Sequence, residues 1–290
     1  MSVNSVYLSF TETMTQICLY QRTVKTQTNL ELNELFQQRE ITTARSMLSG
    51  ARSVNRMHFN NARTGELAAF GGSTQTTDQC IEAAITHKNK QYQWLLAEAY
   101  EAFDKYLTHS YVFLGMENFS VWPLSDYGNN RLSDLTSMGW SGRLELLKNT
   151  KSKVDHILKQ LRKCYPEFAR SETTNALEIN FRVLIVMCQK FRHHIVHDGG
   201  YINDPDSLTK KILDEASING RARDAQERFI RSYIGQSDGL TVVNLLEVES
   251  EVAPLAGLGA HYDICDQLLK LLVSYAHLIK ESSVALQASN

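Results

Sequence analysis

Three histidines and one arginine lie within six residues of each other in the stretch FRHHIVHDGG, residues 191–200. An imidazole can accept or donate a proton near neutral pH, and a guanidinium binds phosphate oxygens through charged hydrogen bonds. In a helix, His193 and His197 lie one turn apart on one face, whereas Arg192 lies about 140° around the axis from His197. The stretch therefore has the groups for acid–base chemistry on a phosphate ester, once a favourable rotamer, a frayed helix end or a partner chain brings Arg192 to the histidines.

A purely structural interpretation of the same stretch also stands. Histidines near a helix C-terminus are stabilised by the helix dipole, and an arginine there can donate hydrogen bonds to the last carbonyls. The stretch by itself leaves both interpretations open.

An apolar helix is expected to carry these residues. Asn175, followed three residues later by Glu178, resembles a capping box that opens the helix. Apolar residues then recur at helical spacing: Leu177, Phe181, Leu184, Cys188 and Ile195. Gly199-Gly200 predicts the helix end, because glycine readily takes the left-handed conformation that closes a helix.

Further helices are predicted by the same spacing, so we expect a predominantly all-α fold. They cover residues 77–114, 143–165, 205–219 and 261–286. Gly115 and Pro166 supply stop signals, and Asp204-Pro205 supplies a start signal. The residues between Gly115 and Gly142 are expected to form a loop or short irregular elements.

Two regions are less regular. Residues 240–248 are rich in valine and leucine and form either one short strand or part of a buried helix. Residues 1–75 are expected to form an N-terminal extension or subdomain before a helical domain over residues 76–290. Leu30, Leu32, Leu35 and Phe36 hint at a helix there, whereas Gly65 and Gly71-Gly72 indicate an irregular connection.

Composition narrows the class of protein. With 43% hydrophobic and 21% charged residues the chain should fold, and its formal net charge of −2 gives no global attraction to polyanions. The five cysteines are odd in number and form no CxxC pair, which favours a reducing compartment. The chain begins without a basic leader and has no apolar run long enough for a membrane span, so we expect a cytoplasmic protein.

The segment Arg192-His193-x-x-x-His197 resembles the motif of the HEPN superfamily, in which an arginine, commonly followed by a polar residue, precedes a histidine by four to six residues. Asp198-Gly199-Gly200 is similar to the family's frequent ending of a polar residue and glycine, and a long amphipathic helix closes the chain. The resemblance covers roughly residues 77–288. It implies a HEPN-like helical bundle that cleaves RNA without a metal ion or other cofactor.

The resemblance also implies roles for the motif residues. The family's active members attack the phosphate with the adjacent ribose 2′-oxygen, leaving 2′,3′-cyclic phosphate ends, generally as homodimers with two facing motifs. His197 would act as general acid or base, Arg192 would neutralise charge on the phosphate, and His193 would orient the pair or the substrate. His194 points elsewhere on the helix and is left outside the site.

Family context suggests a toxin or anti-phage role and a regulatory partner protein. Toxins of the branch controlled by nucleotidyltransferase antitoxins usually carry a tyrosine two residues after the motif histidine. Position 199 here is glycine, and Tyr201 is displaced from that place. Other members are catalytically inactive helical scaffolds, so a dimerising or docking module is the alternative from another class.

A basic helix could guide the RNA backbone to this site, since phosphate contacts are sequence-independent. The predicted contacts are Lys148, Lys151, Lys153, Lys159, Arg162 and Lys163. An ordinary solvated face is the alternative, because these residues spread around the helix.

A metal-dependent phosphohydrolase is the lesser alternative. The His197-Asp198 doublet would need an earlier histidine and a later aspartate as further ligands, and His156 and Asp263 could supply them.

Overall fold

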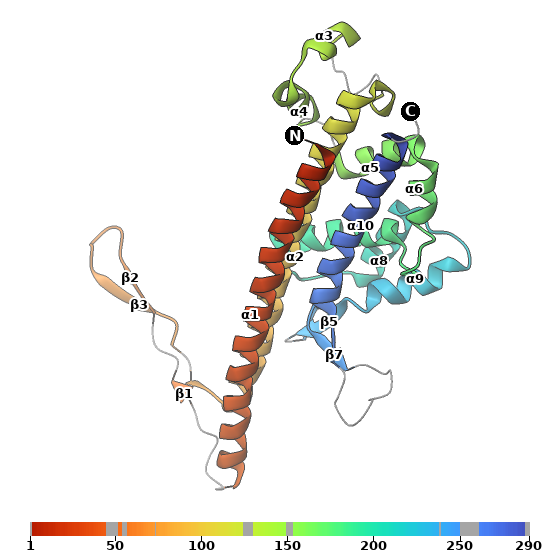
Figure 1. The fold of residues 1–290 in the computed structure, drawn as a ribbon. Helices are drawn as coiled ribbons and strands as arrows, with labels where there is room; N and C mark the ends of the chain where they lie inside the picture. The colour runs from red at the N-terminus through yellow and green to blue at the C-terminus, as the bar shows by residue number, and fades with distance from the viewer. Residues whose placement is uncertain are drawn as a thin grey trace. The chain divides into compact units, whose positions relative to one another are not determined.

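A computed structural model describes residues 2–44, 52–53, 57–72, 74–123, 130–148, 153–237, 239–249 and 261–287. Helices predominate, as expected (Figure 1). They are α1 (Val3–Ala44), α2 (Thr77–Glu117), α3 (Leu132–Ser137), α4 (Trp140–Lys148), α5 (Lys153–Cys164), α6 (Pro166–Ser171), α7 (Phe181–Asp198), α8 (Pro205–Glu215), α9 (Ala222–Arg231) and α10 (Ile264–Gln287), with a 3-10 helix, η1 (Phe119–Val121). Within these residues, no helix combines the length and apolar character needed to cross a bilayer.

The strands form antiparallel pairs of two. In the N-terminal part they are β1 (Arg52–Ser53) with β4 (Thr74–Gln75), and β2 (Met57–Asn60) with β3 (Leu67–Phe70). Further along the chain they are β5 (Ile234–Ser237) with β6 (Leu240–Val243), and β7 (Glu247–Glu249) with β8 (His261–Asp263). The sequence left residues 240–248 as either a strand or part of a buried helix. They contribute to two strands, β6 and β7, with a short connection between them.

The chain divides into two compact units, Met1–Gln21 with Tyr92–Asn290, and Arg22–Gln91. The boundary expected near residue 75 lies inside the second unit, between β4 and α2. In this second unit, Leu35 of α1 packs with Ile81 and Ala84 of α2. The Asn29 side chain accepts a hydrogen bond of 3.1 Å from Lys88 Nζ in the same unit.

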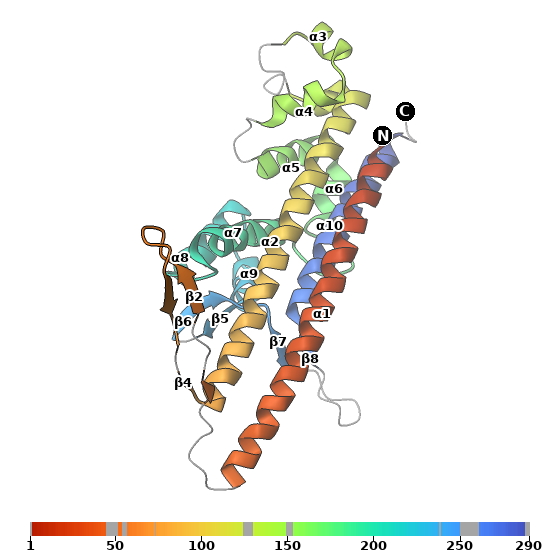
Figure 2. The ribbon, with the colours of Figure 1, turned by 90° about the vertical axis from the view of Figure 1, so that its left-hand side faces the viewer.

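In the larger unit, the part of α1 up to Gln21, the part of α2 from Tyr92 and α10 run side by side (Figures 1 and 2). Phe10 and Phe103 lie 6.3 Å apart between ring centroids, and the Tyr106 hydroxyl donates a 2.8 Å hydrogen bond to the Ala276 carbonyl. Aromatic side chains thus hold three distant segments of the sequence together.

Tyr275 of α10 is the centre of this core and is fully buried. Its ring stacks on Phe181 with a centroid distance of 5.0 Å and an interplanar angle of 4°. Phe103 and Phe168 stack against it as well, at 5.5 and 6.1 Å. The stack ties α2, α6, α7 and α10 to one another, and offset aromatic pairs add to the stabilisation from area burial alone.

Glu172, directly after α6, is a completely buried carboxylate with 0% exposure. It accepts hydrogen bonds from Arg162 Nε at 2.7 Å and Nη2 at 2.8 Å, and from Arg182 Nε at 2.7 Å. The Tyr275 hydroxyl also donates to it. Burial, followed by the Glu172 charge, raises the pKa of Tyr275, so the phenol remains a donor. Two arginines and a tyrosine thus satisfy the buried charge.

Several expected boundaries were wrong or incomplete. The helix that carries the motif begins at Phe181 with Asn180 as its N-cap, not with a capping box at Asn175 and Glu178. The Asn175 side chain instead holds a loop, donating to the Ser171 and Ile179 carbonyls, and Glu178 has a left-handed φ of 57°. Helices α4 and α5 cover the two ends of the helix expected over 143–165, and residues 149–152 lie outside the described residues.

Gly115 does not end its helix, because α2 continues to Glu117. A Cβ on Gly115 would lie 2.1 Å from Trp122 Nε1. The indole is 3% exposed, stacks on Tyr111 at 5.5 Å and donates a 2.9 Å hydrogen bond to the Tyr111 carbonyl. The glycine is therefore needed for close packing of the indole.

Gly115→Ala should destabilise the larger unit by about 1–3 kcal/mol, the usual cost of forcing extra atoms into a packed core. The added methyl group must displace a ring that is fixed by stacking and by a hydrogen bond. Urea unfolding measures the effect, with Gly139→Ala as control, since a Cβ at Gly139 meets no atom within 4 Å. Equal midpoints for the two variants would contradict this account of Gly115.

Candidate functional site

The C-terminal end of α7 is held by its own closing glycines and by contacts with α2 and β6. Gly199 has a φ of 63° and Gly200 a φ of 84°, and the Gly200 N–H donates a 2.9 Å hydrogen bond to the His194 carbonyl. A Cβ at Gly200 would lie 2.2 Å from Gln93 Oε1, so only glycine fits there. Gln93 Nε2 in turn donates to the Val243 carbonyl at 2.6 Å. The predicted glycine stop therefore also locks the helix end between α2 and β6.

The buried face of α7 anchors the helix in the core. Phe181, Leu184, Cys188, Phe191 and Ile195 are all buried. Burial raises the pKa of the Cys188 thiol to about 12, which keeps it protonated at neutral pH. The histidines lie on the remaining surface of the last turns.

The three histidines form a continuous row. The rings of His193 and His197 are 4.7 Å apart between centroids, with an interplanar angle of 48°. The rings of His193 and His194 are 5.9 Å apart. Burial, then the neighbouring His197 and His194, lower the pKa of His193, so this ring is neutral at pH 7. The sequence prediction that His193 and His197 share a face is confirmed by their contact.

Arg192 is directed to α2. Its Nη2 lies 2.6 Å from Glu101 Oε1 in an ion pair, and its side chain is 33% exposed. The Nε atom of Arg192 is buried and has no hydrogen-bond partner within the described residues. Arg192 is therefore next to the histidine row but is turned to a carboxylate on another helix.

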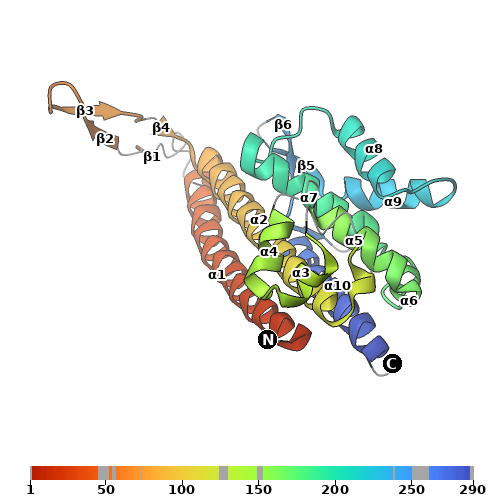
Figure 3. The same cartoon turned by 90° about the horizontal axis from the view of Figure 1, so that it is seen from above.

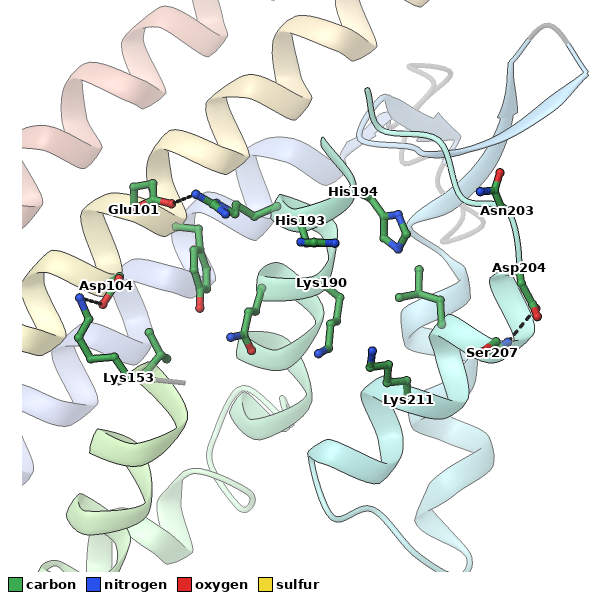
Figure 4. Close-up of a pocket in the computed structure, with 15 residues that line it drawn as sticks. Glu101, Asp104, Lys153, Lys190, His193, His194, Asn203, Asp204, Ser207 and Lys211 are labelled. Carbon is green, nitrogen blue, oxygen red and sulfur yellow. Dashed lines mark hydrogen bonds and ion pairs between the residues drawn. The ribbon is translucent and has the colours of Figure 1, made fainter. Parts of the chain in front are cut away.

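A cavity of about 640 Å³ opens beside this helix end, between α2, α5, α7 and α8. Its lining includes Arg192, His193 and His194, but not His197. Figures 2 and 3 show α8 next to α7, and Figure 4 shows Lys190 of α7 and Lys211 of α8 on the two sides of the hollow. The structure thus gathers part of the predicted motif at a cavity wall and leaves His197 on the adjoining surface.

Most cations of the cavity are paired. Lys153 Nζ lies 3.1 Å from Asp104, and Lys190 Nζ lies 2.7 Å from Glu215. For Lys211, which is exposed, the described residues offer no carboxylate within ion-pair distance. Lys211 is thus the cation with most freedom to bind an incoming anion.

The other residues of the predicted basic face lie in different surroundings. Lys153 lines the cavity, Lys159 pairs with Asp155 at 2.8 Å, and Lys163 is exposed. Arg162 is only 20% exposed and is engaged by Glu172 through two of its nitrogens, so in this structure it stabilises the fold. Lys151 and the Lys148 side chain lie outside the described residues.

His194 and Asp198 were not included in the predicted site. His194 Nδ1 lies 2.8 Å from Asp198 Oδ2, and the histidine side chain is 23% exposed. Their i,i+4 spacing was a signal in the sequence, because such residues are neighbours on a helix surface. Lys190 and Lys211 carried no such signal, since only tertiary packing brings α7 and α8 together.

The metal-ligand set considered for a phosphohydrolase is not assembled. His156 packs edge-on against Tyr111, and Asp263 accepts a hydrogen bond from Gln21. Among the residues with described positions, no group of three or more His, Cys, Asp or Glu side chains could hold a metal ion.

In comparisons with known proteins, no protein-family model, no curated protein and no solved structure matches this chain.

Proposed function

We propose that the protein is a HEPN-type endoribonuclease that cleaves RNA without a metal ion, with Arg192, His193 and His197 at its site. The observation that carries the proposal is the 4.7 Å contact between the His193 and His197 rings beside a cavity lined by Arg192. Neighbouring imidazoles and a guanidinium supply proton transfer and charge neutralisation, which are the two needs of RNA transesterification.

In the proposed reaction the ribose 2′-oxygen attacks the adjacent phosphorus, and the bond from phosphorus to the 5′-oxygen breaks. His197 transfers a proton, and the neutral His193 orients it through their ring contact. Arg192 binds the phosphate with the donors that remain, because a guanidinium has five N–H groups and Glu101 takes up only one of its terminal nitrogens. These steps require no cofactor.

We propose a homodimer as the active form. Arg192 is turned to Glu101 on α2, whereas His197 lies exposed outside the cavity lining. Two facing copies would allow the arginine of one motif to serve the histidine of the other. A cytoplasmic toxin or anti-phage role, with a regulatory partner protein, belongs to the same proposal.

The second candidate function is a silent helical module that dimerises or docks a partner. The Arg192–Glu101 ion pair favours it, because an arginine held by a carboxylate can serve packing alone. RNA binding that weakens with salt but gives no cleavage would support this module.

Cleavage of mixed cellular RNA in EDTA tests the proposal with wild type and Arg192→Ala. Wild type should leave 2′,3′-cyclic phosphate ends, and Arg192→Ala should be about 10²-fold slower, the usual loss when a charge-stabilising donor is removed. Arg223→Ala is the matched control, since Arg223 is 29% exposed and also pairs with one carboxylate, Asp214. A wild type that leaves RNA intact, or cleaves it only with a metal ion, overturns the proposal.

A further inference from the structure

RNA transesterification needs two proton transfers, one from the 2′-hydroxyl and one to the leaving 5′-oxygen. The proposed function assigns one of them, to His197. We propose that His194, held by Asp198, is the second proton-transfer group, the general acid that protonates the leaving 5′-oxygen. This inference rests on the proposed endoribonuclease function.

The geometry of His194 is that of an oriented acid. Its Nδ1 lies 2.8 Å from Asp198 Oδ2, so Nε2 is the nitrogen left for substrate. A carboxylate on one imidazole nitrogen fixes the tautomer and ring orientation, and pairs with the ring when both nitrogens carry protons. His194 lines the cavity, and Figure 4 shows its ring between α7 and α8.

The backbone holds this side chain in place. The His194 carbonyl accepts the Gly200 N–H, and Gly200 is wedged against Gln93. His193, His194 and His197 occupy an arc of about 100° around the helix axis, so one phosphodiester can lie against all three. The His193 ring contacts both of the other rings, with centroid distances of 5.9 Å to His194 and 4.7 Å to His197.

The charges around His194 suit a leaving nucleotide. Lys190 and Lys211 lie on the two sides of the cavity. Lys190 pairs with Glu215 at 2.7 Å, whereas Lys211 is exposed and has no ion pair with a described carboxylate. Asp204 also lines the cavity, but its carboxylate caps α8 by accepting the Ser207 N–H at 2.9 Å. The phosphate that follows the leaving 5′-oxygen can therefore be bound by Lys211 of α8.

The proton balance closes without a co-reactant. His197 takes the 2′-hydroxyl proton while the bond from O2′ to phosphorus forms. His194 gives its Nε2 proton to O5′ while the bond from phosphorus to O5′ breaks. Water then returns one proton to His194 and removes one from His197.

The test compares two RNA substrates, one ordinary and one with sulfur in place of the bridging 5′-oxygen, both in EDTA. A thiolate leaves without protonation, so loss of a general acid matters only for the oxygen leaving group. His194→Ala should slow cleavage of the ordinary RNA about 10²-fold and cleave the sulfur substrate within about threefold of the wild-type rate. His197→Ala should be slow on both.

Asp198→Asn tests the positioning role, and it should show the same rescue by sulfur with a smaller loss on ordinary RNA. The matched controls are His277→Ala and Glu281→Gln, an exposed i,i+4 pair on α10 with a 3.2 Å contact, which should cleave both substrates like wild type. Rescue of His194→Ala by the sulfur substrate also proves that the variant is folded.

Two results overturn the inference and leave the proposed function standing. One is cleavage of ordinary RNA by His194→Ala at the wild-type rate. The other is an equal loss on both substrates in a variant whose circular dichroism and thermal midpoint match those of wild type. Failure of the wild type to cleave either substrate overturns the proposed endoribonuclease function itself.

Discussion

His197→Ala is expected to slow RNA cleavage by about 10²- to 10⁴-fold, the range for loss of a positioned acid–base group. The His197 side chain is exposed at the end of α7, and its ring contacts the His193 ring with a centroid distance of 4.7 Å. Its removal should therefore leave the buried face of the helix intact. Single-turnover rates at saturating protein separate this chemical effect from weaker RNA binding.

The control for this variant is His87→Ala, which changes an exposed helix histidine of α2 in the other unit. It should cleave at the wild-type rate. If His197→Ala kept full activity while Arg192→Ala lost it, proton transfer would belong to another group, and the assignment of His197 would be wrong.

Glu172→Ala should lower the free energy of unfolding by about 3–5 kcal/mol, because removing one partner from a buried ion pair leaves the others buried without compensation. Two guanidinium groups and the Tyr275 hydroxyl all donate to this carboxylate. At roughly 2–4 °C per kcal/mol for a unit of this size, the thermal midpoint should fall by about 6–20 °C. Chemical denaturation gives the free energy directly.

Glu167→Ala is the matched control for Glu172→Ala. Glu167 belongs to neighbouring α6, and both it and its partner Arg170 are largely exposed, at 76% and 71%. Exposed pairs contribute little, so this variant should stay within about 0.5 kcal/mol of wild type. A similar small loss for Glu172→Ala would mean that the buried network is not needed for stability.

Local signals in the sequence predicted where helices lie better than they predicted which residues contact one another. Apolar spacing predicted α7 and α10, and Pro205 predicted the first residue of α8, because these signals act within one turn of a helix. Gly115 was misread as a stop, since the indole that requires a glycine there comes from Trp122, beyond the helix end. Asn175 was misread as a cap because its side chain hydrogen bonds within a loop.

The same limit applied to the site. The helical period placed His193 and His197 on one face, and their rings do touch. The helical period also placed His194 away from His193 and His197, so His194 was left out of the predicted site. His194 nevertheless lines the cavity, because α8 forms a wall of the cavity beside it, and no local sequence pattern encodes that packing. Arg162 looked like part of a basic surface because its partner, the buried Glu172, lies in a different element.

The rate at which the Cys188 thiol is alkylated reports on the candidate site, because Cys188 lies on the buried face of α7. Its thiol is inaccessible and stays protonated at neutral pH, so an alkylating reagent can react with it only when α7 separates from the core. Cys18, Cys80 and Cys164 are only partly buried and should be modified first. Cys265 of α10 is buried as well, so the slow phase has to be assigned to Cys188 by mass spectrometry of the modified peptides before it reports the opening of the helix that carries the histidines.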